Sequence, residues 1–371
     1  MRSTRALVGL MAAAAIVFAA CGGGATPTPE PTEAPSAEPT EAPTPTAEPV
    51  AYKVCMVSDT GGIDDNSFNE NAWKGMQDAQ AKLGVEVKFL ESRTAADYEK
   101  NINQFIGEDC DMIVTVGFLL GDATKAAAEA NPGIRFAIVD FAYDPAIPNV
   151  EGLVYSTSEA AMLAGYVASA VSKTGILGTF GGINIGGPVT DFMSGLVAGA
   201  NYYNAQKGAS VRVLGWDPVA KEGSFTGDFE STDNAKQLTI PMLQEGADVI
   251  LPVGGPIGGG AYAALQESAA EDWGIGVDVD WTESAPQYTD ILLTSILKRI
   301  DNSEAAAIER AVNGEAPQPV FVSTLANEGV GIAPFHDFES LVSAETRAEL
   351  DALAQKIISG EVVVSDYYAA Q

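Results

Sequence analysis

Short apolar runs alternate with helical periodicity along most of the chain after residue 50. Buried strands are predicted where β-branched and other apolar residues run together, at 53–58, 85–90, 112–116 and 136–139. Amphipathic helices are predicted between them, at 67–83, 95–106 and 122–130. This repeated alternation is typical of an α/β fold, a doubly wound parallel sheet with helices on both faces.

The same alternation restarts near residue 158 and continues to the end of the chain. Further strands are predicted at 176–180, 211–214, 249–252, 276–278, 291–294 and 320–323. Further helices are predicted at 158–172, 190–207, 233–245, after Gly260, and at 298–312 and 344–359. We therefore expect two similar lobes, because one α/β series follows another. Residues 51–155 plus about 281–318 are expected in the first lobe, and 156–280 plus about 319–371 in the second.

The N-terminus has the pattern of a secretory signal. Arg2 and Arg5 precede an apolar run that ends at Ala20, which is too short to span a bilayer comfortably. We predict a signal peptide over residues 1–20. The small residues before Cys21 resemble a bacterial lipobox, with Phe18 where leucine is more usual, so Cys21 is the expected lipidation site. The alternative is an ordinary cleaved signal with a leftover cysteine.

Residues 21–50 are rich in proline, threonine, glutamate and alanine. This composition cannot bury enough apolar surface to offset the entropy of ordering, so it predicts a disordered, semi-rigid spacer. With a lipid on Cys21, the segment would tether a globular part to the extracytoplasmic face of a membrane. An unselected disordered tail is the alternative.

The balance of charged and metal-binding residues excludes several classes of function. The chain has 20 basic and 50 acidic residues, a net charge of −30, which argues against nucleic-acid binding. His336 is the only histidine, so a zinc site or a histidine-based triad is not expected. We predict no cofactor and no metal. Cys55 lies in the first predicted strand and Cys110 just before the third, its neighbour in a flavodoxin-like order, so the two are either disulfide-bonded or two buried thiols.

Polar residues and glycines follow the predicted strands, where ligands bind in doubly wound sheets. Asp59, Asp140, Gly254 and Asp278 each stand at such a strand end. A carboxylate accepts hydrogen bonds from ligand hydroxyls or ring N–H groups, and Phe68 offers an apolar face to a planar group. The alternatives are helix N-caps for the aspartates and a core position for Phe68.

The segment from Asp59 to Asn69 reads D-T-G-G-I-D-D-N-S-F-N and resembles the opening signature of the basic membrane protein family. Members of that family are solute-binding lipoproteins of ABC importers, and they include purine nucleoside receptors. The likeness continues at 117–118, 136–140, 181–182, 254–255, 275–280 and 293–299. It implies a type I periplasmic-binding-protein fold, a nucleoside between two lobes and delivery to a permease, without enzymatic activity.

The resemblance also implies roles for individual residues. Two aromatic rings would enclose the base, Phe68 and either Phe225 or Phe229, with Phe229 favoured. Asp278 and Lys298 would hold the ribose, with Lys298 offsetting the charge of Asp278. The remaining wall would consist of a backbone contact at Gly254 and the polar side chains of Asp59, Asn69 and Asp140.

Two other functions fit parts of the pattern. The same fold could serve as a membrane-anchored sensor of a nucleoside or another small solute, which signals to a second membrane protein. A nucleoside hydrolase would need a calcium-binding carboxylate cluster, and the aspartates of 59–65 have the wrong spacing for it. We expect a monomer that binds a small molecule and an ABC permease.

Overall fold

The computed structural model describes residues 51–268 and 270–370. The predicted signal peptide, Cys21 and the spacer to residue 50 lie outside the described residues. Within the described ranges, no helix combines the length and apolar character needed to cross a membrane.

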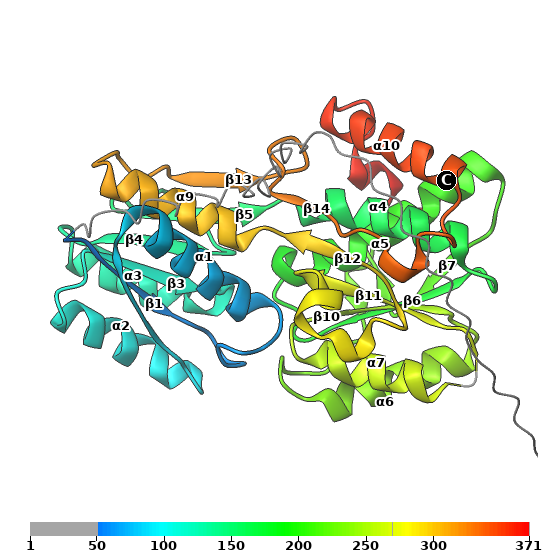
Figure 1. Ribbon diagram of the computed structural model, residues 1–371, viewed down its shortest axis with the longest axis horizontal. Helices are drawn as coiled ribbons and strands as arrows, with labels where there is room; N and C mark the ends of the chain where they lie inside the picture. Colours follow the sequence, from blue (N-terminus) through cyan, green and yellow to red (C-terminus); the bar gives the residue numbers. More distant parts are fainter. Residues whose placement is uncertain (1–50, 269, 371) are drawn as a thin grey trace, which may run out of the picture. The chain divides into compact units, whose positions relative to one another are not determined.

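The first lobe is built on a six-stranded parallel sheet (Figure 1). Its strand order is β13 (Val320–Ser323), β5 (Val150–Tyr155), β4 (Arg135–Val139), β3 (Met112–Val116), β1 (Lys53–Val57) and β2 (Glu86–Leu90). The helices of this lobe are α1 (Phe68–Leu83), α2 (Tyr98–Gly107), α3 (Gly121–Ala130) and α9 (Ile300–Val312). All five residues of β3 are buried, as its continuous apolar run predicts.

The second lobe repeats this plan with one antiparallel edge strand. Its order is β14 (Val330–Ile332), β12 (Leu292–Lys298), β11 (Trp273–Asp278), β10 (Val249–Val253), β6 (Ile176–Gly181) and β7 (Arg212–Leu214). Only the β12–β14 pair is antiparallel among the described pairs of this sheet. The helices are α4 (Thr157–Val171), α5 (Gly187–Lys207), α6 (Thr232–Gln244), α7 (Ile257–Glu267), α8 (Trp281–Ser284) and α10 (Ala344–Ile358).

A two-stranded hairpin and several short helical turns complete the described fold. The hairpin consists of β8 (Trp216–Asp217) and β9 (Glu222–Gly223). Single 3-10 turns occur at Ala95–Asp97, Phe118–Leu120, Pro286–Tyr288, His336–Phe338 and Val364–Tyr367.

The chain passes between the lobes after Tyr155, after Lys298 and after Ser323. This corrects the predicted lobe boundaries. β12 lies in the second sheet although 281–318 was expected in the first lobe, and β13 lies in the first sheet although 319–371 was expected in the second. Only α9 of the predicted return segment lies in the first lobe. The reason is physical: an apolar strand fits the edge of either sheet, so its sequence does not specify its neighbours.

The cysteines Cys55 and Cys110 form a disulfide, with Cα atoms 6.1 Å apart. Cys55 lies in β1, and Cys110 stands two residues before β3, the neighbour of β1 in the sheet. The parallel pairing of β1 and β3 thus decides between the two alternatives that the sequence leaves open.

Glycines allow α4 and α5 to pack closely in the second lobe. A side chain at Gly165, Gly195 or Gly199 would collide with the main chain of the facing helix. This close packing fixes α5, whose first turns reach the cavity described next.

Candidate functional site

A cavity lies at the carboxyl ends of the strands of both lobes. The first lobe contributes the loops after β1, β3 and β4 and the start of α1. The second contributes the start of α5, the segment around Phe229, the loop after β10 and the ends of β11 and β12. All eight predicted ligand-binding residues line this one cavity: Asp59, Phe68, Asn69, Asp140, Phe229, Gly254, Asp278 and Lys298.

Asp65 fixes the start of α1. Its carboxylate accepts hydrogen bonds from the main-chain N–H groups of Ser67 (2.9 Å), Asn69 (2.9 Å) and Glu70 (3.1 Å). These are N–H groups that a helix leaves without internal partners, so Asp65 caps the helix. Phe68 and Asn69 therefore stand in a fixed first turn. Sequence reasoning missed Asp65, although a capping residue just before an amphipathic run is a recognisable signal.

Asn69 links two carboxylates and leaves an acceptor without a partner. Its Nδ2 atom donates to Asp59 Oδ1 (3.0 Å) and Asp65 Oδ2 (3.3 Å). Its Oδ1 atom is buried and has no hydrogen-bond partner among the described residues. Because a buried acceptor without a partner is costly, this oxygen is well placed to receive an N–H or O–H group of a ligand. Burial raises the pKa of Asp59 well above its ordinary value, against the opposing effect of the Asn69 hydrogen bond.

Asp140 and Asp278 occupy matching places in the two lobes. Asp140 follows β4, and Asp278 is the last residue of β11. Both have left-handed backbone conformations, with φ of 65° and 69°. A non-glycine residue pays a conformational cost there, so surrounding structure must hold each aspartate in place.

Lys298 forms an ion pair with Asp140, and its positive charge also offsets that of Asp278, as expected. Its Nζ atom lies 2.5 Å from Asp140 Oδ2, and both side chains are buried. Both residues stand at strand ends that meet at the cavity, because Asp278 ends β11 and Lys298 ends the neighbouring strand β12.

Asp278 instead accepts a hydrogen bond from the Ser67 hydroxyl at 3.0 Å. Burial raises the pKa of Asp278 to about 6, while the positive charge of Lys298 acts in the opposite direction. The carboxyl group therefore titrates close to neutral pH.

Aromatic side chains reach the cavity from both lobes. Phe68 and Phe229 are partly exposed and line it from the first and second lobe. Phe225, the alternative to Phe229, packs against Trp216 with ring centroids 6.0 Å apart and is not among the lining residues. Phe192 of α5 also lines the cavity and was missed. α5 is apolar around most of its surface, so no periodic signal distinguishes Phe192 from core residues.

The charge of the cavity restricts what it can bind. Among the described residues, its charged lining groups are Asp59, Asp65, Asp140, Asp278 and Lys298. This excess of carboxylates favours neutral or cationic ligands and disfavours anions. No group of three or more histidine, cysteine, aspartate or glutamate side chains in the described ranges could hold a metal ion.

The fold and the cavity define the class of protein. Two doubly wound lobes joined by crossing segments, with a cavity lined from both, make a type I periplasmic-binding-protein fold. The chain belongs to the Bmp family, described as ABC transporter substrate-binding protein PnrA-like, which matches residues 52–367.

The chain is similar to two named relatives and to one solved structure. The chain is 31% identical to the CD4+ T-cell-stimulating antigen of Listeria monocytogenes, over 85% of this chain and 88% of that protein. It is 28% identical to the ABC transporter nucleoside-binding protein BmpA of Lactococcus lactis, over 82% and 88%. A crystal structure of a solute-binding protein of an ABC transporter system from Aeropyrum pernix K1 superposes with a TM-score of 0.75 at 27% identity, covering 84% of this chain and 92% of that one.

Proposed function

We propose that this protein captures a purine nucleoside in the cavity and delivers it to the permease of an ABC importer. The observation that carries the proposal is the convergence of two partly exposed phenylalanine rings, one from each lobe, with buried carboxylates and one buried lysine. The family membership supports the transport role. The printed name of the Lactococcus lactis relative, a nucleoside-binding protein, supports the choice of ligand.

The lining side chains match the parts of a nucleoside. Phe68 and Phe229 offer faces for a planar base. Asp278 can accept hydrogen bonds from ribose hydroxyls, and Lys298 can donate to the ribose oxygens. Asn69 Oδ1 can accept from a ring or amino N–H group of the base, which would satisfy an otherwise unpaired buried oxygen. In this proposal Asp59 and Asp140 complete the polar wall, and Gly254 brings main chain close to the ligand.

The acidic lining favours a nucleoside over its phosphorylated forms. A nucleotide would place a doubly charged phosphate near Asp59, Asp140 and Asp278. One lysine, already paired with Asp140, offers little compensation for that charge.

Isothermal titration calorimetry with inosine, guanosine and adenosine tests the ligand, with inosine monophosphate and ribose as controls. We expect at least one nucleoside to bind far more tightly than either control. Incubation with the bound nucleoside should release no free base, because the proposal includes no covalent step. If a sugar binds and no nucleoside does, the ligand assignment is wrong although the transporter class stands.

We further propose that the mature protein is a monomer held on the extracytoplasmic face of the membrane by a lipid on Cys21, with residues 22–50 as its tether. Acidic character and the signal pattern support this location. Replacing Cys21 with serine should move the protein from the membrane fraction to the soluble fraction without changing nucleoside binding. Retention of the Cys21→Ser protein on the membrane would contradict lipid anchoring.

A further inference from the structure

Lys298 stands at one crossing between the lobes and Tyr155 at another. Lys298 is the last residue of β12, and Tyr155 is the last residue of β5. The Lys298 Nζ atom lies 5.0 Å from the centre of the Tyr155 ring. The two residues are 143 positions apart in sequence. Only the fold therefore brings these strand ends together.

Three aromatic rings enclose the Lys298 ammonium. Besides Tyr155, the rings of Phe68 and Phe192 lie 5.0 Å and 5.8 Å from Nζ. Phe68 and Phe192 line the cavity, whereas Tyr155 is not among its lining residues. Aromatic faces attract a cation through their quadrupole and accept no conventional hydrogen bond from it. The rings therefore stabilise the charge while its N–H groups remain available.

The hydrogen bonds of Lys298 leave it with donors to spare. An ammonium group has three N–H donors, and in the described structure Asp140 Oδ2 accepts one of them. If further carboxylates surrounded the Lys298 ammonium, they would accept its two remaining N–H groups. Because aromatic rings surround it instead, these N–H groups remain available to oxygen atoms of a ligand.

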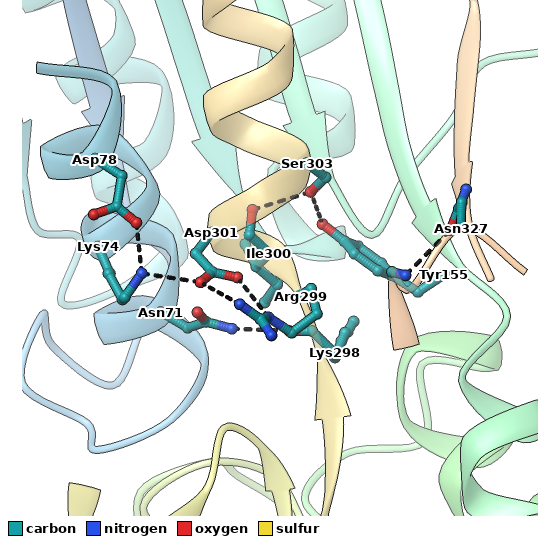
Figure 2. A network of polar contacts seen from close by, with 11 residues as sticks. Asn71, Lys74, Asp78, Tyr155, Lys298, Arg299, Ile300, Asp301, Ser303 and Asn327 are labelled. Carbon is teal, nitrogen blue, oxygen red and sulfur yellow. Dashed lines mark hydrogen bonds and ion pairs between the residues drawn. The ribbon is translucent and has the colours of Figure 1, made fainter. Parts of the chain in front are cut away.

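The hydroxyl of Tyr155 is tied to the helix that follows Lys298. It lies 2.6 Å from Ser303 Oγ in the first turn of α9, and Ser303 Oγ itself donates to the carbonyl of Ile300 at 3.0 Å (Figure 2). Because the serine proton is used in that second bond, Tyr155 is the donor in the first. Burial raises the pKa of Tyr155 well above its ordinary value, which keeps this donor protonated.

The main chain of Lys298 is held from the first lobe as well. Asn71 of α1 donates its Nδ2 hydrogen to the Lys298 carbonyl at 2.8 Å (Figure 2). The lysine is thus fixed at its carbonyl by α1 and at its ammonium by Asp140 and the rings. Of the three rings, only that of Tyr155 does not line the cavity.

We propose that Tyr155 is a positioning residue of the ligand site: anchored to α9 through Ser303, its ring holds the Lys298 ammonium so that spare N–H donors face ligand hydroxyls. The test with ligand hydroxyls rests on the proposed nucleoside function. The position of the Lys298 ammonium does not rest on that function, because it can be measured in the protein without ligand.

The first experiment follows the Lys298 ammonium by proton–nitrogen NMR of the purified protein, assigned by loss of the signal in Lys298→Met. Protons above aromatic faces are shifted upfield, so Tyr155→Leu should move this signal downfield. Tyr155→Phe, which keeps the ring and loses its anchor on Ser303, should move it in the same direction by a smaller amount. Tyr262→Leu is the matched control, because Tyr262 is a fully buried tyrosine that packs against Trp281, and it does not line the cavity. An unchanged ammonium signal in Tyr155→Leu would overturn the proposal.

The second experiment compares binding of inosine and 2′,3′-dideoxyinosine to the same variants. Tyr155→Leu should weaken inosine binding by about 3- to 30-fold and weaken the dideoxy compound much less, because only inosine offers both hydroxyls to the lysine. A merely structural role would weaken both equally, which would also overturn the proposal. If Tyr155→Leu does not fold, Ser303→Ala keeps the ring, removes its anchor and should shift both readouts in the same direction. If neither compound binds the wild type while the ammonium signal still moves, the nucleoside assignment fails and the positioning role stands.

Discussion

The hydroxyl of Ser67, just before α1 of the first lobe, lies 3.0 Å from the carboxylate of Asp278 in the second lobe. The same hydroxyl lies 3.0 Å from the carbonyl oxygen of Val277. A hydroxyl has one proton to share between these acceptors. When Asp278 is protonated it can itself donate to Ser67, so the protonation of one cavity residue changes a contact between the lobes.

The affinity for nucleosides should therefore depend on pH. Burial raises the pKa of Asp278 to about 6, and the ionised carboxylate accepts much stronger hydrogen bonds from ribose hydroxyls than the protonated acid does. With that pKa, the ionised fraction and hence the affinity should rise about tenfold between pH 5 and pH 7. Calorimetry across this range checks the prediction, and Asp278→Asn should flatten the profile.

Asp191 provides the control for the pH experiment. Burial raises its pKa to about 6 as well, but it is not among the residues that line the cavity. Asp191→Asn should keep the pH dependence of the wild type. If the pH profile of affinity becomes flat in Asp191→Asn and not in Asp278→Asn, then Asp191 causes the pH dependence and the prediction for Asp278 is wrong.

Phe229 should contribute mainly to nucleoside affinity, and Phe225 mainly to stability. Phe229→Ala should reduce nucleoside affinity by about 10- to 100-fold, since a base loses one stacking face, and should change the unfolding temperature little. Phe225→Ala should lower stability by about 3 kcal/mol, because its ring packs on Trp216, and should leave affinity nearly unchanged. Calorimetry and thermal unfolding of both variants measure the two effects, and equal losses of affinity would argue against Phe229 as the stacking ring.

Glu304 is fully buried in α9, and neither carboxylate oxygen has a partner among the described residues. Burial raises its pKa well above the ordinary value of 4.5. The folded state therefore binds the proton more tightly than the unfolded state, and stability falls as pH rises above 4.5 towards the folded pKa. Glu304→Met should raise the free energy of unfolding by about 1–3 kcal/mol at pH 8 and by less at pH 4.

Urea unfolding at the two pH values tests this prediction. Glu129→Met is the matched control, since Glu129 is an exposed residue of helix α3. A gain that is equal at pH 4 and pH 8, or equal in both variants, would show that Glu304 carries no titration penalty.

Glu151 joins two arginines in the first lobe. Its buried carboxylate accepts hydrogen bonds from Arg135 (3.2 Å) and from Arg310, which link β4, β5 and α9. Glu151→Gln leaves two largely buried positive charges without an anion and should cost about 3–5 kcal/mol of stability. Chemical unfolding measures the loss.

The exposed pair of Lys82 and Glu309 gives a comparison for that variant. Glu309→Gln should cost less than about 1 kcal/mol, because solvent screens an exposed pair. Similar losses of stability in Glu151→Gln and Glu309→Gln would mean that burial does not increase the contribution of Glu151 to the free energy of unfolding.

Most of the secondary structure could be predicted from local patterns. The helix ending at Leu83 is followed by Gly84 in the left-handed conformation, and β3 matches its apolar run residue for residue. The strand β5 was missed because Glu151 interrupts its apolar pattern. That charge becomes acceptable only beside Arg135 and Arg310, which come from distant segments.

The sequence by itself determined the alternating α/β plan and the positions of the strand ends, and its resemblance to a known family pointed to the eight residues that share the cavity. The plan and the strand ends depend on local periodicity and on the rule that parallel strands end at one edge of a sheet. Only the tertiary structure decided which sheet receives β12 and β13, that Cys55 bonds Cys110, and that Lys298 pairs with Asp140. Each of these depends on contacts between segments far apart in sequence, and the local pattern of residues does not specify such contacts.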